Sequence, residues 1–227
     1  MRVLINVAMT ADGKLAPANR RFIPFGSQYD RDLMMELRSR CDAVMSGART
    51  VDLSPVTLGP GGERYRKKRL ARGLSEYNIR VIVSGSGTID PDAAIFEKQH
   101  SPIIIIASQK ITAGRLRKLR QKATAVEAFG KTEVDFRKAL DWLEKEWNVR
   151  SLVCEGGGEL NDGLLRAGVV NEVYVTICPV IFGGRHAPTM SDGRGFQSLD
   201  GAMRLNLERK RRRGDELYLV FNAGSAA

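Results

Sequence analysis

The residues best suited to chemistry lie in one short stretch, 151–161, with the sequence SLVCEGGGELN. Its first four residues predict a buried strand, and the three glycines after Glu155 predict a tight turn into a helix. Glycine lets backbone N–H groups approach an anion, and the start of a helix adds partial positive charge. The stretch lacks both a G-x-G-x-x-G pattern and the lysine of a P-loop. The turn is therefore either a phosphate site or an ordinary strand-to-helix connection.

The composition limits the class of protein. The chain has 227 residues, 43% hydrophobic and 27% charged, so we expect one globular domain over 1–227. It has neither an apolar run of membrane-spanning length nor a signal-peptide pattern, so we expect a cytoplasmic protein and no membrane partner. Cys41, Cys154 and Cys178 fall inside expected elements, where free thiols act as small apolar residues. With two histidines and no Cys-x-x-Cys, we expect no metal site.

The net charge is +10, which favours an anionic partner. The basic residues are spread along the chain instead of being gathered with aromatic residues, so nucleic acid is not the expected partner. A positive field would instead concentrate phosphorylated small molecules near the protein. The basic segments are 20–21, 64–72, 115–122 and 209–213.

Strand patterns recur along the chain and end in a hairpin. Four consecutive isoleucines, 103–106, favour a parallel strand covered on both faces. Two alternating segments around Gly214 predict an antiparallel hairpin. The expected strands are 2–9, 42–47, 79–83, 102–107, 123–128, 151–154 and 172–179, followed by hairpin strands 203–208 and 216–221.

Helices are expected between these strands. Apolar residues on one face of 28–41 predict a helix that turns its arginines outward, with Ser27 as its cap. A short basic helix is expected over 112–122. The pattern at 132–135 resembles a capping box before the next helix, and Gly168 is expected to end the helix after the glycine turn. Between Leu53 and Asn78 the periodicity disappears, which predicts one long irregular loop.

Alternating strands and helices predict an α/β fold, a three-layer αβα arrangement around a mainly parallel sheet with a C-terminal antiparallel hairpin. In such sheets ligands bind beyond the carboxyl ends of the strands. The segments expected there are 8–14, 47–50, 84–87, 107–108, 128–130 and 155–158.

Five motifs occur along the chain, at Asn6–Lys14, Ser46–Thr50, Glu155–Asn161, Gly168–Glu172 and Pro179–Pro188. Together and in this order they resemble the dihydrofolate-reductase-like reductases of riboflavin biosynthesis. The resemblance runs nearly end to end, and the tail around 192–196 looks most like the stand-alone archaeal form. The zinc deaminase half of the bifunctional members has no counterpart here, because His-x-Glu and Pro-Cys-x-x-Cys patterns are absent.

The resemblance implies an NADPH-dependent oxidoreductase acting on a CH–OH group. Its reaction would reduce the ribosyl group of 2,5-diamino-6-ribosylamino-4(3H)-pyrimidinone 5′-phosphate, a phosphorylated pyrimidine, to ribityl. It also implies a homodimer, to which the hairpin is a plausible contributor. The implied cofactor-binding residues are Ala8, Met9, Thr50, Ser54, Ser84, Gly85, Ser86, Gly87, Gly156, Gly157 and Gly158. The substrate-binding candidates are Asn6, Arg38, Arg64 and Glu155.

Lys14 and Glu155 are the catalytic candidates that the resemblance suggests. Hydride transfer leaves negative charge on a carbonyl oxygen or imine nitrogen, and a nearby cation such as Lys14 would stabilise it. A lysine after Asp-Gly is also an ordinary exposed loop residue. The Glu155 carboxylate can accept hydrogen bonds from ribose hydroxyls or pyrimidine amines, but it also suits the start of a helix.

One segment departs from the family pattern. Many members have Asp-Asp-Pro-x-Leu-Thr after the second strand, whereas this chain has DLSPVTLGPGG over 52–62. Ser54 stands where those members have a cofactor-contacting aspartate, and Arg64 is the candidate for the 5′-phosphate contact. The altered loop leaves two alternatives open: a related reductase of another pterin or carbonyl compound, and a basic protein that binds nucleotides or RNA without catalysis.

Overall fold

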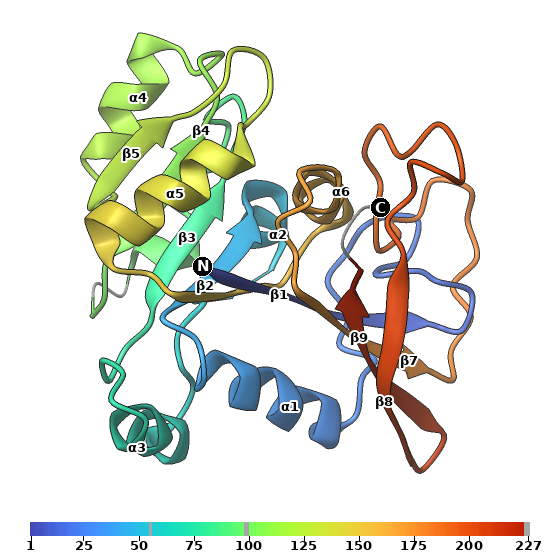
Figure 1. The fold of residues 1–227 in the computed structure, drawn as a ribbon. Helices are drawn as coiled ribbons and strands as arrows, with labels where there is room; N and C mark the ends of the chain where they lie inside the picture. Colours follow the sequence, from blue (N-terminus) through green and yellow to red (C-terminus); the bar gives the residue numbers. More distant parts are fainter. Residues whose placement is uncertain (55, 98–99, 225–227) are drawn as a thin grey trace. The chain divides into compact units, whose positions relative to one another are not determined.

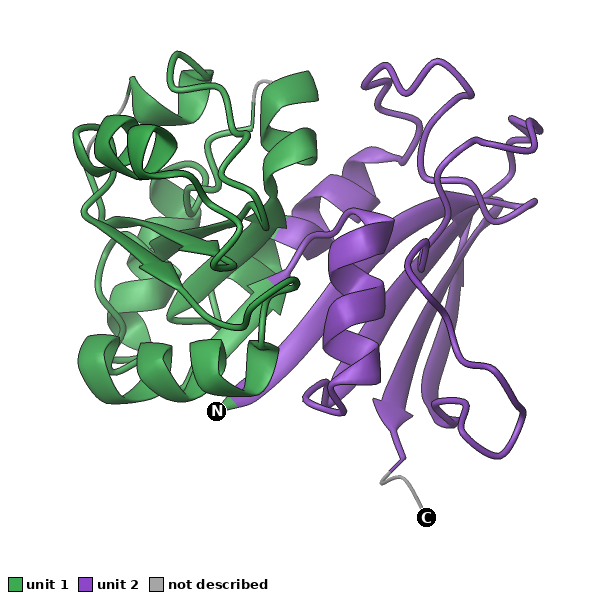
Figure 2. Cartoon of the chain, turned by 90° about the horizontal axis from the view of Figure 1, so that it is seen from above, with its two compact units in different colours: residues 1, 35–153 green, residues 2–34, 154–227 purple. Residues whose placement is uncertain are grey.

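The computed structural model describes residues 1–54, 56–97 and 100–224 and has nine strands and six α-helices in that part of the chain (Figure 1). The chain divides into two compact units, coloured separately in Figure 2. Unit 1 consists of Met1 and Met35–Val153, and unit 2 consists of Arg2–Met34 and the chain from Cys154 onward. Each unit is described by itself, and the single domain over 1–227 stays a prediction.

Unit 1 holds five strands in the order β5-β4-β3-β2-β6. The β2–β3, β3–β4 and β4–β5 pairs are parallel, as expected. All five residues of β4 are buried, which confirms that its isoleucines are covered on both faces. The strands are β2 (Ala43–Gly47), β3 (Ile79–Val83), β4 (Ile103–Ala107), β5 (Ala125–Ala128) and β6 (Ser151–Cys154).

Two helices of unit 1, α4 and α5, begin at residues whose side chains cap free backbone N–H groups, whereas α2 and α3 follow glycines. Thr112 caps α4 by accepting a hydrogen bond from the Arg115 N–H, as expected. The capping-box interpretation of 132–135 is wrong, because Asp135 is itself the N-cap and accepts from the Lys138 N–H. These helices are α2 (Ala48–Leu53), α3 (Glu63–Ala71), α4 (Ala113–Arg120) and α5 (Phe136–Trp147), with a 3-10 turn at Ala94–Phe96.

The expected irregular loop over 53–78 is also wrong in part, because it contains α3; its residue 55 lies outside the described residues. This helix lacks an aliphatic stripe and buries Tyr65 and Arg69 instead. The Arg69 guanidinium donates to the carbonyl oxygens of Arg38, Cys41 and Ser75. A buried arginine that is hydrogen-bonded to carbonyl oxygens adds nothing to the hydrophobic periodicity of a helix. The hydrophobic pattern of the sequence therefore could not predict α3.

Unit 2 holds four strands in the order β1-β7-β9-β8. β1 and β7 are parallel, while β7–β9 and β8–β9 are antiparallel, which confirms the C-terminal hairpin. The first hairpin strand is longer than expected and is almost entirely exposed. The strands are β1 (Arg2–Thr10), β7 (Glu172–Cys178), β8 (Leu205–Arg213) and β9 (Glu216–Ala223).

Helices α1 (Gln28–Arg38) and α6 (Gly158–Arg166) begin in unit 2. The Ser27 hydroxyl accepts from the Asp30 N–H at 3.3 Å, as expected for a cap. Gly168 follows α6 with φ +64°, the conformation that suits glycine at a helix end. The outward orientation expected for the arginines of α1 is wrong for Arg38, which is only 4% exposed.

Candidate functional site

In unit 1 the predicted cofactor turn at 84–87 is tied to the ends of β3 and β4. The Ser84 hydroxyl accepts from the Thr88 N–H at 2.9 Å, which closes the turn. The Gly85 carbonyl accepts from the Ser108 N–H at 2.9 Å and from the Ser108 hydroxyl at 2.6 Å. These bonds bring together two of the segments that the sequence places at the carboxyl ends of the strands.

Two glycines of this turn have different roles. Gly87 has φ +69°, and a Cβ atom there would lie 2.7 Å from Ile111, so glycine is required by the fold. A Cβ atom on Gly85 would have no heavy atom within 4 Å among its neighbours. Gly85 is exposed, and its missing side chain leaves space for a ligand.

Thr50 and Ser54 are joined through α2, which follows β2. The Ser54 hydroxyl donates to the Thr50 carbonyl oxygen at 2.5 Å, and Ser54 is 8% exposed. Thr50 is half-buried. The hydroxyl of Ser54 therefore binds the backbone at the end of α2, which is a structural role. The comparison with the cofactor-contacting aspartate of other family members did not predict this role.

The two arginine candidates differ in exposure. Arg38 donates from Nη1 to the Gly59 carbonyl oxygen at 2.7 Å inside unit 1. Arg64 is exposed on α3, with its guanidinium 5.3 Å from the centre of the Tyr65 ring. Arg38 thus holds the loop that precedes α3, while Arg64 presents its charge to solvent.

In unit 2 the glycine turn connects β6 to α6. Gly156 has φ +79°, and Gly157 is the N-cap of α6 without a side-chain cap hydrogen bond. A Cβ atom on Gly158 would lie 2.5 Å from the Thr189 carbonyl oxygen, so the segment 189–192 packs directly on the helix start. Glu155, half-buried, immediately precedes this turn.

Residues behind the turn hold it in place. The buried amide of Asn161 donates to the Met190 carbonyl oxygen at 2.9 Å, and its Oδ1 accepts from the Cys154 thiol at 3.5 Å. Burial raises the pKa of the Cys154 thiol to about 12. Because the thiolate is the reactive form, Cys154 acts as a packed donor and not as a nucleophile.

The β1 end carries the other predicted residues of unit 2. Asn6 is 9% exposed, and Ala8 and Met9 are half-buried near the end of the strand. The Lys14 N–H donates to the Thr10 hydroxyl at 2.9 Å, and the Lys14 carbonyl accepts from the Thr10 N–H at 2.9 Å. The ammonium of Lys14 has no ion pair within the described residues.

Asp12 has a role that the sequence pattern did not reveal. Its carboxylate accepts from the Gly183 N–H at 2.7 Å and from the Phe182 N–H at 3.3 Å. The Thr10 hydroxyl, which also donates to it, is the main cause of its lowered pKa. Asp12 therefore ties the loop before Lys14 to the segment after β7.

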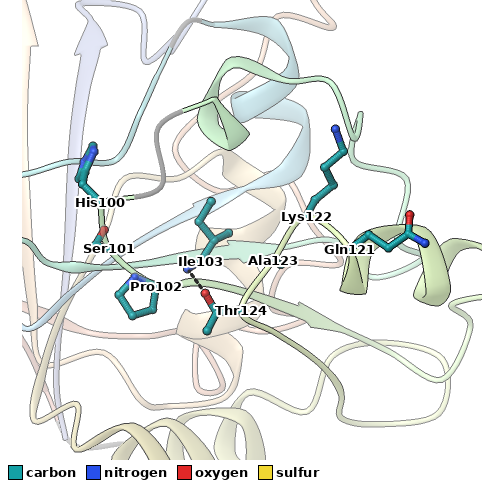
Figure 3. Close-up of a pocket in the computed structure, with 8 residues that line it drawn as sticks. All are labelled: His100, Ser101, Pro102, Ile103, Gln121, Lys122, Ala123 and Thr124. Carbon is teal, nitrogen blue, oxygen red and sulfur yellow. Dashed lines mark hydrogen bonds between the residues drawn. The ribbon is translucent and has the colours of Figure 1, made fainter.

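A cavity of about 390 Å³ lies elsewhere in unit 1. Its lining residues lie at the amino ends of β4 and β5, where the Thr124 hydroxyl accepts a hydrogen bond from the Ile103 N–H at 3.1 Å (Figure 3). The cavity is therefore at the strand ends opposite to the turn at 84–87, and no predicted site residue lines it. Its lining residues are His100, Ser101, Pro102, Ile103, Gln121, Lys122, Ala123 and Thr124.

Two classes of feature are absent from the described residues. They contain no group of three or more histidine, cysteine, aspartate or glutamate residues that could hold a metal ion. In the same ranges, no helix has both the length and the apolar character needed to cross a membrane.

Comparison with known proteins identifies the family. A reductase from Methanothermobacter thermautotrophicus, named 2,5-diamino-6-ribosylamino-4(3H)-pyrimidinone 5′-phosphate reductase, is 33% identical over 219 residues, covering 96% of each chain. A protein of the same name from Archaeoglobus fulgidus is 29% identical over 194 residues, covering 86% of this chain and 87% of that protein.

A solved structure shows the same fold. A pyrimidine reductase-like protein from Corynebacterium diphtheriae superposes with a TM-score of 0.80 at 21% identity, covering 98% of this chain and 91% of that one. The model of the RibD C-terminal domain matches residues 1–219. The chain therefore belongs to the RibD C-terminal domain family.

Proposed function

We propose that the protein reduces the ribosyl group of 2,5-diamino-6-ribosylamino-4(3H)-pyrimidinone 5′-phosphate to ribityl in riboflavin biosynthesis, with NADPH as the reductant. The observation that carries this proposal is the 33% identity, over 96% of both chains, to a reductase named for that substrate. The reaction makes the protein an oxidoreductase that acts on a CH–OH group. The relatives' names favour this function over the two alternatives that the altered loop left open.

The turn at 84–87 fits the adenosine end of NADPH. Gly85 is exposed with free space at its Cβ position, so a ribose phosphate can approach the backbone there. Ser86 is half-buried, and its carbonyl oxygen accepts from Arg115 at 3.2 Å, which keeps a cation beside the turn. We assign Ser84–Gly87, with Thr50 and Ser54, to cofactor binding in unit 1.

The glycine turn of unit 2 fits the pyrophosphate. Gly157 begins α6 with no side chain competing for the first N–H groups of the helix, which suits an anion. We assign Gly156, Gly157 and Gly158 to this contact. Ala8 and Met9, half-buried near the end of β1, are assigned to the nicotinamide.

The remaining candidates are assigned to the substrate. A bound reduced nicotinamide supplies the hydride; the ammonium of Lys14 stabilises the negative charge that then develops. Glu155 accepts hydrogen bonds from substrate hydroxyls or amines. Asn6 and Arg38 contribute to holding the substrate, and Arg64 contacts its 5′-phosphate.

Loss of absorbance at the NADPH band tests the function directly. We expect NADPH oxidation that depends on the ribosylamino-pyrimidinone phosphate. Tight NADPH binding without oxidation would favour a related reductase of another substrate. Absence of NADPH binding together with salt-sensitive RNA binding would favour a non-catalytic protein.

Two substitutions test the assignments in unit 2. Gly157→Asp places a carboxylate where the pyrophosphate is assigned and should abolish NADPH binding, whereas unchanged affinity would make the turn purely structural. Glu155→Gln should lower kcat more than NADPH affinity. Glu159→Gln, an exposed glutamate in the first turn of α6, is the matched control and should leave both unchanged.

A homodimer and a cytoplasmic location complete the proposal. The edge strand β8 is almost entirely exposed, and Leu207 and Leu217 of the hairpin are 53% and 43% exposed. Leu207 lies on the edge strand β8 and Leu217 on its partner β9, and exposed leucines in a hairpin at the edge of a sheet support self-association. Sedimentation of the purified protein tests the dimer, and cell fractionation tests the location.

A further inference from the structure

The turn after β3 has hydrogen-bond donors that the protein itself does not use. The Gly87 N–H donates to the Ser84 carbonyl oxygen at 3.0 Å, which makes Ser84–Gly87 a β-turn with Gly85 and Ser86 at its central positions. No described residue accepts a hydrogen bond from the N–H of either central residue or from the Ser86 hydroxyl. Gly85 is exposed and Ser86 is half-buried, so a ligand can reach these three donors.

The turn is fixed by the neighbouring strand β4 and the residue that follows it. The Ser84 N–H donates to the Ile106 carbonyl oxygen at 2.9 Å. Ser108 donates to the Gly85 carbonyl oxygen from both its N–H and its hydroxyl. A binding segment that is ordered before its ligand arrives loses little conformational entropy on binding. The free donors of the turn are therefore preorganised.

Arg115 adds a positive charge to the same turn. Its Nη1 donates to the Ser86 carbonyl oxygen at 3.2 Å, and its backbone N–H donates to the hydroxyl of Thr112, the N-cap of α4, at 3.4 Å. Arg115 is exposed and forms no ion pair with another described residue. A guanidinium group has five N–H donors, so the bond to Ser86 leaves most of them for a ligand.

This set of donors suits a phosphate group. Adjacent backbone N–H groups, a hydroxyl and a guanidinium all donate to phosphate oxygens. NADPH carries a pyrophosphate, which we assign to Gly156–Gly158, and a terminal phosphate on the 2′ oxygen of its adenosine ribose. A terminal phosphate has three acceptor oxygens and a charge near −2 at neutral pH, so it can use several donors at once. NADH lacks this phosphate.

We propose that Arg115 is the residue that determines the preference for NADPH over NADH. Its guanidinium binds the 2′-phosphate, together with the N–H groups of Gly85 and Ser86 and the Ser86 hydroxyl. This inference rests on the proposed reductase function and adds to it a residue outside the turn. An arginine close to the adenosine ribose is a general means of accommodating a 2′-phosphate.

The decisive experiment compares Arg115→Gln with Arg117→Gln. Arg117 is also exposed on α4, and two residues along a helix place it about 200° around the axis, so its variant loses the same charge at another site. Calorimetric titrations use NADPH and NADH, and also 2′,5′-ADP and 5′-ADP, which differ in the 2′-phosphate and need no turnover.

Arg115→Gln should weaken the binding of NADPH and 2′,5′-ADP by roughly 10-fold or more, the usual effect of losing a hydrogen bond to a charged group. The affinities for NADH and 5′-ADP should not change, and Arg117→Gln should bind all four compounds as the wild type does. Arg115→Lys should recover part of the loss, because it keeps the charge without the planar fork. High salt should reduce the preference of the wild type for NADPH.

The results separate the inference from the proposed function. Unchanged NADPH affinity in a folded Arg115→Gln variant would overturn the inference and leave the reductase function intact. An equal loss of NADPH and NADH affinity would also overturn it, because Arg115 would then only support the turn. Wild-type protein that neither binds nor oxidises NADPH would overturn the reductase function itself, and the inference with it.

Discussion

The Glu216 carboxylate accepts hydrogen bonds from both the backbone N–H and the hydroxyl of Ser27, at 2.7 and 2.6 Å. Glu216, the first residue of β9, therefore fixes the position of Ser27, which caps α1. The bonds join parts of unit 2 that are 189 positions apart in the chain. They place the first turn of α1, with Asp30, against the sheet.

Replacing Glu216 with glutamine should destabilise unit 2. The new amide NH₂ would face the hydroxyl and N–H donors, so we expect a loss of roughly 1–3 kcal/mol in the free energy of unfolding at neutral pH. The folded-state pKa of Glu216 is lowered, so its contribution is present above the unfolded pKa and is lost as pH falls through the folded value. Urea unfolding at several pH values should show the two proteins converging in acid. A constant difference at every pH, or an equal effect of the exposed control Glu208→Gln, would contradict this account.

Glu36 should make unit 1 sensitive to acid. Burial of its carboxylate is outweighed by hydrogen bonds from Lys68, Arg72 and Arg40, which lower its pKa to about 2. The stabilisation is therefore present above the unfolded pKa, 4.5, and disappears as pH falls toward 2. Because the partners are partly exposed, Glu36→Gln should cost about 1 kcal/mol at neutral pH. High salt should reduce this difference, and Glu63→Gln, an exposed acid on α3, should show almost none.

Two glycine substitutions should separate ligand binding from folding. Gly85→Ala adds a Cβ atom with nothing within 4 Å, so thermal stability should be unchanged while NADPH affinity falls. Gly158→Ala places a Cβ atom 2.5 Å from the Thr189 carbonyl oxygen and should lower the Tm. Calorimetric titration with NADPH and thermal unfolding distinguish the two effects. Normal NADPH affinity in Gly85→Ala would remove this turn from the proposed cofactor site.

Arg69 should be essential for the stability of unit 1. Its guanidinium donates to three carbonyl oxygens, those of Arg38 at the end of α1, Cys41 just beyond it and Ser75, and Arg69 is 1% exposed. Arg69→Leu removes the guanidinium donor from all three carbonyl oxygens, of which those of Arg38 and Cys41 belong to buried residues, so we expect a loss of roughly 3 kcal/mol. Lys67→Leu on the exposed side of the same helix is the control. Similar urea midpoints for the two variants would show that the Arg69 bonds contribute little.

Local patterns in the sequence predicted most of the helices and strands. The β3 and β6 bounds agree with the expected strands, and Thr112 and Gly168 act at the helix ends where they were expected. These features depend on residues close in sequence: an apolar run, a hydroxyl before a helix, or a glycine with positive φ. The candidate site residues stay predictions, because they concern a ligand and were assigned through family resemblance.

The errors have a common physical origin. Arg38 and α3 were misjudged because buried guanidinium groups, paired with distant carbonyl oxygens, look like solvent-exposed charges in a sequence. The hydrogen bonds from Ser27 to Glu216 join residues far apart in the chain, and no periodicity encodes them.

The sequence by itself determined the family, the alternation of strands and helices and the positions of the glycine turns, because motif order and local backbone preferences are properties of neighbouring residues. Only the tertiary structure decided which polar groups are buried and what they contact. It separated the glycines required by packing, such as Gly158, from one that leaves open space, Gly85. It also surrounded Glu216 with hydrogen-bond donors, since burial and hydrogen bonding depend on segments that meet only when the chain folds.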